Sequence, residues 1–345
     1  MKKEVVVIGG GIAGCSSAYF LQKAGFEVTL YEKNTLCGGG SFAAGAFLSP
    51  KLSKPSPYKE YLNTALRFSL DFYEKNFPST FKRTSLHKYP KDEKDWQKLL
   101  SYEEFIDFKY EKKDDFFILD FAGIVDPKEV CKKLVEKIQV YENTHIEDLQ
   151  EFKDKIIIIA HPNQNLLHLP YIKTKDIGGY RYDVLFKGCE TKEFNSHREL
   201  SVSCYFKKKI AVGATYLRGE KELEEKALCD SEHLLKKAQD FYPMVNMKLL
   251  KHYTGYRNMT FDFFPIVGKA INSDATLKKY PYIKKGTKVP PSKYIYYEDI
   301  YLHTALGSRG FVYAPYNAKL LTDHITKNTS IPDRLSPVRL FKKLK

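Results

Sequence analysis

The first 33 residues carry the clearest pattern of apolar and polar positions in the sequence. Val5 to Ile8 is a continuous apolar run, Gly9 to Gly14 is rich in glycine, and Val28 to Tyr31 is a second apolar run that ends at Glu32. Short apolar runs bounded by glycine are typical of strands buried on both faces. We therefore predict a strand, a glycine turn, a helix and a second strand.

Similar patterns recur along the rest of the chain. Apolar residues at helical spacing predict a helix over 58–75, and Asp126-Pro127 predicts the N-cap and first position of a helix that runs to about 138. Four isoleucines within 155–160 predict a buried strand, and 221–241 predicts one long helix. Further strands are predicted at 140–146, 180–186, 200–206, 209–215 and 300–305.

This order of elements predicts an α/β protein of two interleaved domains. A Rossmann-like, nucleotide-binding domain is assembled from 1–50, 120–165 and 255–345. An α+β substrate domain with a mostly antiparallel sheet is inserted as 51–119 and 166–254. We see no internal repeat and no low-complexity linker between them.

Composition adds a candidate partner and a compartment. The 345 residues include 56 Lys and Arg against 42 Asp and Glu, a net charge of +14. Such a surplus indicates a polyanion, nucleic acid before an anionic membrane, although a lysine-rich proteome gives the same surplus. Six scattered cysteines without CxxC spacing predict reduced thiols and neither a disulfide framework nor a metal site. No apolar run reaches the ~18 residues of a membrane span, so we expect a soluble, cytoplasmic protein without a membrane partner.

The glycine turn has the spacing of a dinucleotide-binding motif. Gly9 permits the tight turn, Gly11 lets the backbone approach a pyrophosphate, and Gly14 lets the helix pack on the sheet. The helix N-terminus then faces the phosphates. Glu32 follows about 20 residues later, where a carboxylate accepts hydrogen bonds from a ribose. The motif predicts a bound dinucleotide.

A second glycine turn near the far end of the chain favours FAD over NAD. Gly307-Ser308-Arg309-Gly310 offers backbone N–H groups and a guanidinium, which suit the electron-rich edge of a reduced flavin. An arginine that only holds the turn is the alternative interpretation of Arg309.

Arg257 is the candidate substrate-binding residue. It lies in the aromatic run 255–268, where a guanidinium can hold a carboxylate through two parallel hydrogen bonds. A salt bridge from Arg257 to an acid such as Asp262 fits the sequence equally well.

Several motifs, taken in order, resemble one enzyme family. They are Gly9–Gly14 with Glu32, the segment 41–53 with Gly45 and Pro50-Lys51-Leu52-Ser53, the segment 212–216, the run 257–268, the turn 306–315, and Ser336-Pro337-Val338-Arg339. The chain resembles the superfamily of D-amino-acid oxidase and glycine oxidase, which are FAD enzymes. Within it, the chain is most similar to the FAD-dependent C-terminal half of the bifunctional tRNA wobble-uridine enzymes, the MnmC family. It departs from the family pattern at Asp176 to Tyr180.

The resemblance implies a cofactor, a reaction and site residues. It implies FAD bound non-covalently, since the terminal motif has no cysteine. It implies oxidation of 5-carboxymethylaminomethyl-(2-thio)uridine at the tRNA wobble position, with loss of glyoxylate and formation of 5-aminomethyl-(2-thio)uridine. Arg257 becomes the predicted catalytic residue, as the clamp for the substrate carboxylate. The predicted cofactor-binding residues are Gly9, Gly11, Ile12, Ala13, Gly14, Glu32, Lys33, Gly40, Ser41, Gly45, Ile146, Gly307, Ser308, Arg309 and Gly310.

The same resemblance gives the positive charge a role. Predicted tRNA contacts are Lys284 and Lys285, within a stretch of interleaved Lys and Tyr at 272–297, and Lys342 and Lys343 in the tail. The methyltransferase half has no counterpart, so the resemblance implies that methylation of the product is either absent or carried out by a separate methyltransferase as partner. Two other functions stay open: a small-molecule oxidase of glycine, sarcosine or a D-amino acid, and an FAD-bearing RNA-binding protein without catalysis.

Overall fold

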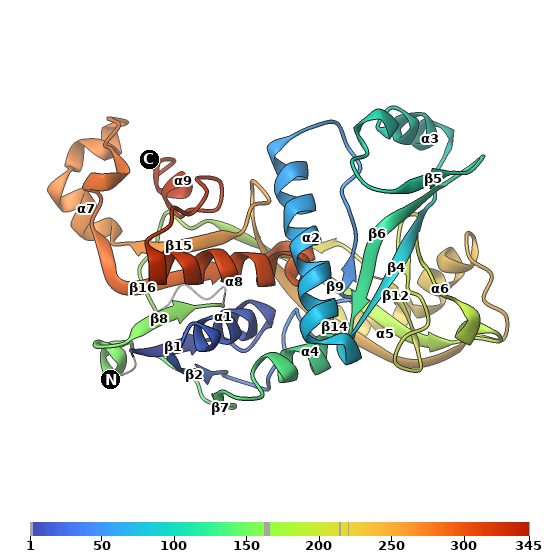
Figure 1. Cartoon of the computed structure of the whole chain (residues 1–345), viewed down its shortest axis with the longest axis horizontal. Coiled ribbons are helices and arrows are strands. Elements are labelled where there is room, and N and C mark those ends of the chain that lie inside the picture. Colours follow the sequence, from blue (N-terminus) through green and yellow to red (C-terminus); the bar gives the residue numbers. More distant parts are fainter. Residues whose placement is uncertain (1–2, 162–165, 214, 220, 345) are drawn as a thin grey trace.

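The computed structural model describes residues 3–161, 166–213, 215–219 and 221–344. In this part of the chain the strands form one sheet of six and one of ten, and each sheet forms the centre of a lobe. Figure 1 shows the two lobes at opposite ends of the molecule, with helix α2 (Pro57–Asn76) standing between them. Segments from both ends of the chain meet in the first lobe.

The six-stranded sheet has the order β15-β16-β8-β1-β2-β7. Its strands are β1 (Glu4–Ile8), β2 (Glu27–Tyr31), β7 (Gln139–Tyr141), β8 (Ile156–Ile159), β15 (Ile266–Ile271) and β16 (Tyr296–Thr304). All neighbours in this sheet are parallel except β15, which is antiparallel to β16. The four isoleucines of β8 are all buried, because helices and loops cover both faces of the sheet. The α/β class predicted from the sequence is confirmed.

Helices α1 (Ile12–Lys23) and α4 (Pro127–Leu134) pack beside each other next to the glycine turn that follows β1. Helix α1 follows β1 directly, and small residues from Ala13 to Ala18 bury its first turns against α8 (Gly310–Lys327) and the sheet. Asp126 caps α4 by accepting a hydrogen bond from the Glu129 N–H at 3.0 Å, as predicted.

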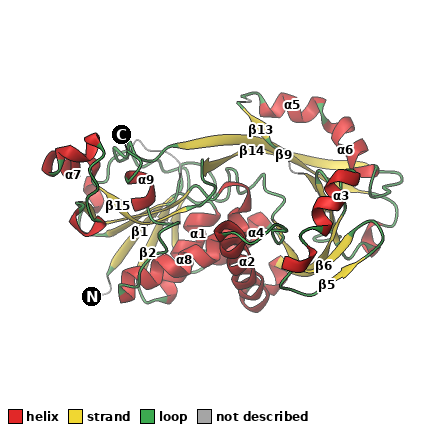
Figure 2. Ribbon diagram, turned by 90° about the horizontal axis from the view of Figure 1, so that it is seen from above, coloured by secondary structure: helices red, strands yellow, loops and turns green. Residues whose placement is uncertain are grey.

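The ten-stranded sheet is mostly antiparallel, in the order β13-β9-β12-β11-β10-β4-β6-β3, with β14 also paired to β9 and β5 to β6. Its strands are β3 (Phe47–Leu48), β4 (Phe81–Lys88), β5 (Tyr110–Lys112), β6 (Phe117–Val125), β9 (Thr174–Leu185), β10 (Asn195–His197), β11 (Ser201–Val202), β12 (Ile210–Gly213), β13 (Leu217–Arg218) and β14 (Lys248–Thr260). Figure 2 shows the long strands β9 and β14 reaching from this lobe toward the first.

Helices α5 (Leu223–Cys229) and α6 (Ser231–Gln239) cover the outer side of this sheet (Figure 2). The sequence predicted one helix over 221–241; the structure breaks it at Asp230, which is the C-cap of α5 and accepts a hydrogen bond from the buried Tyr180 hydroxyl. Helix α3 (Glu93–Leu100) covers the far end. Helix α2, capped by Ser56 with Pro57 at its first position, packs its buried face against α8.

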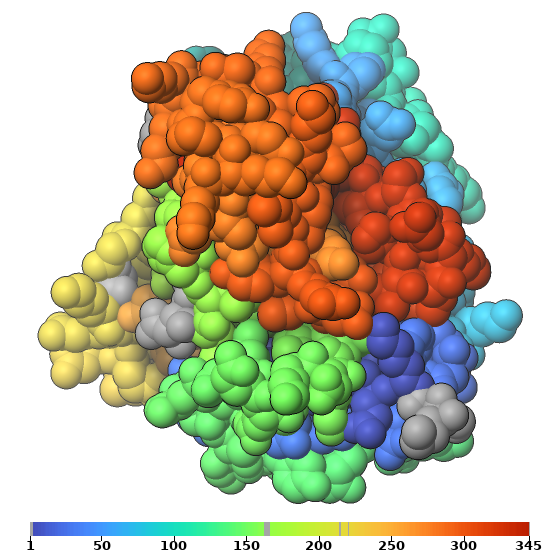
Figure 3. All heavy atoms as spheres, turned by 90° about the vertical axis from the view of Figure 1, so that its left-hand side faces the viewer, coloured from blue at the N-terminus to red at the C-terminus, as the bar shows by residue number. Residues whose placement is uncertain are grey.

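Residues 272–297 leave the first sheet between β15 and β16 and form a cap, shown in orange in Figure 3 beside the red C-terminal residues. It contains α7 (Ser273–Lys279) and short 3₁₀ turns, and α9 (Val338–Phe341) lies next to it. Tyr294 is buried here, and Tyr280, Tyr296 and Tyr297 pack against the same apolar core, whereas Tyr282 is exposed.

The predicted division into two domains stays a proposal at residue level. Residues 120–125 of β6 and 255–260 of β14, which we assigned to the nucleotide-binding domain, lie in strands of the ten-stranded sheet. Strand β14 therefore runs from the second lobe to the edge of the first.

Candidate active site

The glycine turn after β1 places the start of α1 over the end of the parallel sheet. A Cβ on Gly14 would lie 1.8 Å from the Gly9 carbonyl oxygen, so no side chain fits at this helix–turn contact. The Gly10 N–H donates to Glu32 Oε2 at 2.7 Å, and the Asn34 N–H donates to Glu32 Oε1 at 2.9 Å. The carboxylate of Glu32 is therefore fixed beside the turn, at the end of β2.

The loop 39–46 joins this turn to the second lobe. Ser41 Oγ accepts a hydrogen bond from the Ile12 N–H, the first amide of α1, at 3.0 Å. Gly40 lies against β14, where a Cβ would come within 2.1 Å of the Tyr256 carbonyl oxygen. The residue before Arg257 on β14 thus contacts the loop that caps the cofactor helix.

The remaining predicted residues near this turn lie in different surroundings. Lys33 is exposed. The pKa of His161 is lowered to about 4, mainly because His161 is removed from solvent and next because of the charge of Lys33. Ile146 is buried in the core beneath β1 and β8. Gly45 is buried and lines a small cavity with Arg181 and Asp183.

The terminal glycine turn lies beside the first one. Residues Gly307–Arg309 form a 3₁₀ turn that leads into α8, and a Cβ on Gly310 would contact the Ile12 side chain at 3.3 Å. The N-termini of α1 and α8 are therefore neighbours. Arg309 donates to the Ser49 carbonyl oxygen at 2.8 Å, which uses one of the five N–H donors of its guanidinium. Ser308 is exposed on the same turn.

Met259 connects the terminal turn to β14. Its backbone bridges to Leu306, and a Cβ on Gly307 would lie 3.3 Å from the Met259 Cβ. Alternate residues of a strand share a face, so Met259 and Arg257 lie on one side of β14. Arg257 is thus two residues from a contact with the predicted flavin motif.

Arg257 has a neutral partner. Its Nη2 donates to the Thr215 carbonyl oxygen at 2.6 Å, and within the described residues no carboxylate lies within ion-pair distance of it. Burial lowers the pKa of Arg257 from its ordinary value, an effect that the nearby Tyr216 opposes. The alternative interpretation, a salt bridge from Arg257 to Asp262, is wrong, because Asp262 pairs with Arg339.

Two residues that the sequence analysis did not assign hold Arg257 in place. A Cβ on Gly179 would lie 2.1 Å from Arg257 Nη2 and 2.5 Å from the Thr215 oxygen, so only glycine leaves room for the guanidinium. Thr215 itself is fixed because its Oγ1 accepts the Tyr180 N–H at 3.0 Å. The segment 176–180, where the sequence departs from the family pattern, therefore contains Gly179, the residue against which the Arg257 guanidinium lies. Ala214, between the motif residues 213 and 215, lies outside the described residues.

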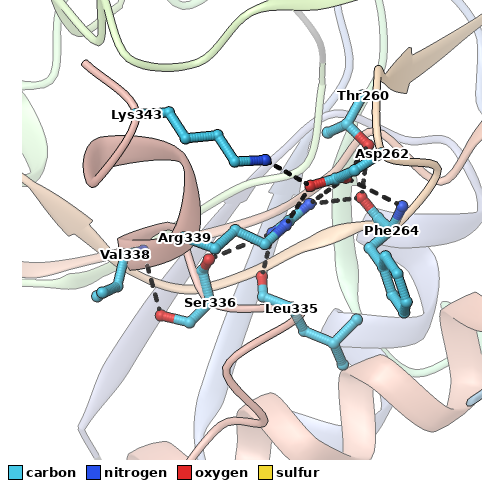
Figure 4. A network of polar contacts seen from close by, with 8 residues as sticks. All are labelled: Thr260, Asp262, Phe264, Leu335, Ser336, Val338, Arg339 and Lys343. Carbon is cyan, nitrogen blue, oxygen red and sulfur yellow. Dashed lines mark hydrogen bonds and ion pairs between the residues drawn. The ribbon is translucent and has the colours of Figure 1, made fainter. Parts of the chain in front are cut away.

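Asp262 and Arg339 form a network at the end of β14, drawn in Figure 4. Arg339 donates to Asp262 Oδ2 and Oδ1 at 3.1 and 3.2 Å and to the carbonyl oxygens of Phe264, Leu335 and Ser336. Burial alone raises the pKa of Asp262, but the hydrogen bonds and charge of Arg339 hold it below its ordinary value. The Pro337-x-Arg339 tail thus ties the C-terminal segment to the β14–β15 turn.

The predicted tRNA-contacting lysines do not gather at Arg257. Lys284 and Lys285 are exposed on the cap of residues 272–297, and Lys342 is exposed after α9. Lys343 Nζ lies 3.8 Å from Asp262 Oδ2, at the margin of the Arg339 network (Figure 4). Every helix in the described residues is too short or too polar to cross a membrane.

The residues around the two glycine turns fit an FAD. Within 4 Å, a Cβ on Gly11 would meet only Ser41 Oγ, and one on Gly39 would meet nothing, so the backbone here is open to a ligand. Two neighbouring helix N-termini present positive dipole ends of the kind that bind a pyrophosphate, and Glu32 lies where a ribose is held. The donors at Gly307–Gly310 lie on the side nearer Arg257.

Comparison with known proteins gives the same assignment. Residues 4–324 match the family model DAO, FAD dependent oxidoreductase. The tRNA 5-methylaminomethyl-2-thiouridine biosynthesis bifunctional protein MnmC of Campylobacter fetus subsp. fetus (strain 82-40) is 25% identical, and the alignment covers 99% of this chain and 60% of that protein. The chain thus spans about three fifths of the length of this curated relative.

Solved structures confirm the fold. Glycine oxidase from Bacillus cereus ATCC 14579 superposes with a TM-score of 0.73 at 15% identity, over 95% of this chain and 96% of that one. Iminodiacetate oxidase from Chelativorans sp. BNC1 gives 0.74 at 14% identity, over 96% and 98%. The chain is an oxidoreductase enzyme, as the sequence predicted. It belongs to the DAO family of FAD-dependent oxidoreductases.

Proposed function

We propose that this enzyme removes the carboxymethyl group of 5-carboxymethylaminomethyl-(2-thio)uridine at the wobble position of tRNA. The products are glyoxylate and 5-aminomethyl-(2-thio)uridine. The similarity to MnmC over almost the whole chain supports this substrate, and the net charge of +14 suits a polyanionic one.

The observation that carries the proposal is the partly buried Arg257, which has no anionic partner among the described residues. Removing a cation even partly from water has a cost unless a counter-charge meets it, and Arg257 has only a neutral carbonyl oxygen as partner among the described residues. The missing counter-charge is the substrate carboxylate, which a guanidinium binds through two parallel hydrogen bonds.

The positions of the other residues give Arg257 its role. It holds the carboxylate on the face of β14 where Met259 meets Gly307, and so fixes the adjacent methylene carbon; such positioning lowers the barrier of a reaction substantially. When bound, FAD supplies the acceptor for a hydride from that carbon. Gly9–Gly14, Glu32 and Ser41 would hold its nucleotide part, and Gly307–Gly310 its flavin end, without a covalent bond. Water then hydrolyses the imine of the substrate, which releases glyoxylate and the aminomethyl base.

The remaining partners follow from this reaction. A methyltransferase activity acting on the aminomethyl product is the proposed partner activity, and Lys284, Lys285, Lys342 and Lys343 are proposed phosphate contacts. Their contribution is electrostatic, so tRNA affinity should fall steeply as salt rises.

The test is incubation of the FAD-loaded enzyme with tRNA from cells that lack the activity, followed by nucleoside mass spectrometry. We expect the carboxymethylaminomethyl nucleoside to disappear and the aminomethyl nucleoside to appear. Arg257→Ala should abolish most turnover with FAD still bound, whereas Arg83→Ala, which removes an exposed arginine paired with Glu74, should not. Turnover of free glycine, sarcosine or a D-amino acid with tRNA untouched would replace the proposal with the small-molecule oxidase.

A further inference from the structure

The turn between β14 and β15 is held rigidly by Asp262. Its Oδ1 accepts the Thr260 hydroxyl at 2.9 Å and the Phe264 N–H at 3.3 Å, while Arg339 binds the carboxylate from the other side. Thr260 Oγ1 also contacts the Phe264 carbonyl oxygen at 2.8 Å, which closes the turn from end to end. The backbone of residues 260–264 is therefore fixed by side chains that point inward (Figure 4).

The two remaining residues of this turn point outward and are large and apolar. Phe261 is 64% exposed and Phe263 is 50% exposed. Phe263 also has a φ of +66°, a conformation that is costly for a bulky residue and is maintained only by strong surrounding contacts. The Asp262 network thus presents two aromatic rings to solvent in fixed positions.

Cations accompany these rings on the Arg257 face of the sheet. Lys175 Nζ lies 5.1 Å from the ring centre of Phe261 and 5.5 Å from that of Phe263. Lys175 pairs with Met259 across β9 and β14, and paired residues share a face, so this lysine lies on the same face as Arg257.

A third exposed ring lies on the other side of Met259. Tyr216 is 43% exposed, its hydroxyl lies 3.6 Å from the Met259 sulfur, and the Arg218 guanidinium lies 5.6 Å from its ring centre. Arg218 pairs with Ile177, which pairs with Arg257, so this cation also belongs to the Arg257 face. We call Tyr216, Phe261 and Phe263, with Lys175 and Arg218, the aromatic rim.

We infer that the aromatic rim binds the unpaired bases of an RNA loop by stacking, while Lys175 and Arg218 contact its phosphates. This inference rests on the proposed function and adds the surface that receives the RNA. Aromatic faces stack on splayed bases, and single-stranded RNA is bound by such rings together with cations. Among the described residues no carboxylate pairs with Lys175, Arg218 or Arg257, so an apolar partner would leave these cations without counter-charges there, whereas a polyanion supplies them.

This surface differs from the one that the sequence indicated. The interleaved lysines and tyrosines of 272–297 looked suited to stacking, but four of the five tyrosines there pack into the core. The aromatic rim instead combines exposed rings with the side chain that binds the substrate carboxylate.

The test measures RNA binding separately from catalysis. FAD-loaded enzyme is titrated into a fluorescent RNA stem-loop with an unpaired, uridine-containing loop, and into a fully paired RNA duplex, with anisotropy as the readout. We expect tighter binding of the stem-loop. Phe261→Ala with Phe263→Ala should raise its Kd at least about fivefold, the effect of losing one base stack, and leave duplex binding unchanged.

Control variants separate stacking from other effects. Phe261→Trp with Phe263→Tyr should keep the wild-type Kd, and Tyr110→Ala, an exposed ring at the far edge of the second sheet, should also keep it. Wild-type stem-loop affinity in the double alanine variant would overturn the inference, as would an equal loss on the duplex. A change of oligomeric state in that variant with unchanged RNA affinity would identify the rim as a self-association surface and also overturn it.

The outcome for the proposed function is distinct. If wild-type enzyme oxidises the wobble nucleoside while the double alanine variant binds normally, only the aromatic rim is refuted. If the rim binds the stem-loop but the nucleoside is untouched, only the proposed reaction is refuted.

Discussion

Gly179 offers the sharpest test of the arginine site, because one methyl group placed there would occupy the Arg257–Thr215 hydrogen bond. The added Cβ would lie 2.1 Å from Arg257 Nη2 and 2.5 Å from the Thr215 oxygen. Ordinary contacts begin at 3.4 Å, so the guanidinium nitrogen must move by about 1.3 Å. Gly179→Ala therefore displaces the clamp without touching either glycine turn.

The magnitude follows from the cost of misplacing a positioning group. A shift of about 1 Å costs on the order of 100-fold in rate, which corresponds to about 3 kcal/mol of transition-state stabilisation. We expect kcat/KM of Gly179→Ala to fall by about this factor, with FAD still bound. The assay measures anaerobic flavin reduction at increasing concentrations of the carboxymethylaminomethyl substrate. Loss of the visible absorbance of the flavin is the readout.

Gly178→Ala is the matched control. Its Cβ would lie 2.6 Å from a terminal methyl of Leu223, on the α5 side of the sheet and away from Arg257. This variant should lose about 1–3 kcal/mol of stability through overpacking and keep its substrate kinetics. Wild-type kinetics in Gly179→Ala, or an equal rate loss in both variants, would refute the role assigned to Gly179.

Three further predictions concern the cofactor loop and the tail. Ser41→Ala removes the acceptor of the Ile12 N–H and should weaken FAD binding by about 1 kcal/mol, measured by fluorescence of released flavin; unchanged affinity would contradict this role. Arg339→Lys loses the bidentate pair with Asp262 and should lower the free energy of unfolding by about 2 kcal/mol in urea titrations. Because the pKa of Asp262 is depressed from 3.8 in the folded state, its stabilisation is complete above that value and is lost as pH falls through the folded pKa. An acid titration of Asp262→Asn should lack this component.

The sequence predicted the local features well, because each rests on contacts between near neighbours. The turn from Gly9 to Gly14 and the cap at Asp126 depend on backbone geometry that a few adjacent residues determine. The buried strand at Ile156–Ile159 follows from four apolar residues in a row.

The partners of the site residues could not be predicted in the same way. Asp262 lies five positions from Arg257, yet it binds Arg339, 77 positions away, because the tail returns to the β14–β15 turn. From the sequence alone, Gly179 is only a residue that weakens a strand. Its role in making room for Arg257 becomes evident once β14 is known to pair with β9. The exposure of Phe261 and Phe263 also depends on this fold, since the same sequence pattern is typical of core residues.

The position of β8 has a consequence for how the chain is made. This strand lies between β1 and β16, and β16 ends only at Thr304. Until the ribosome has synthesised β16, one edge of β8, with its four consecutive isoleucines, has no partner strand. Such an open strand edge can pair with other chains. Truncations that remove β16 should accumulate as aggregates even though the glycine turn and its helix are intact.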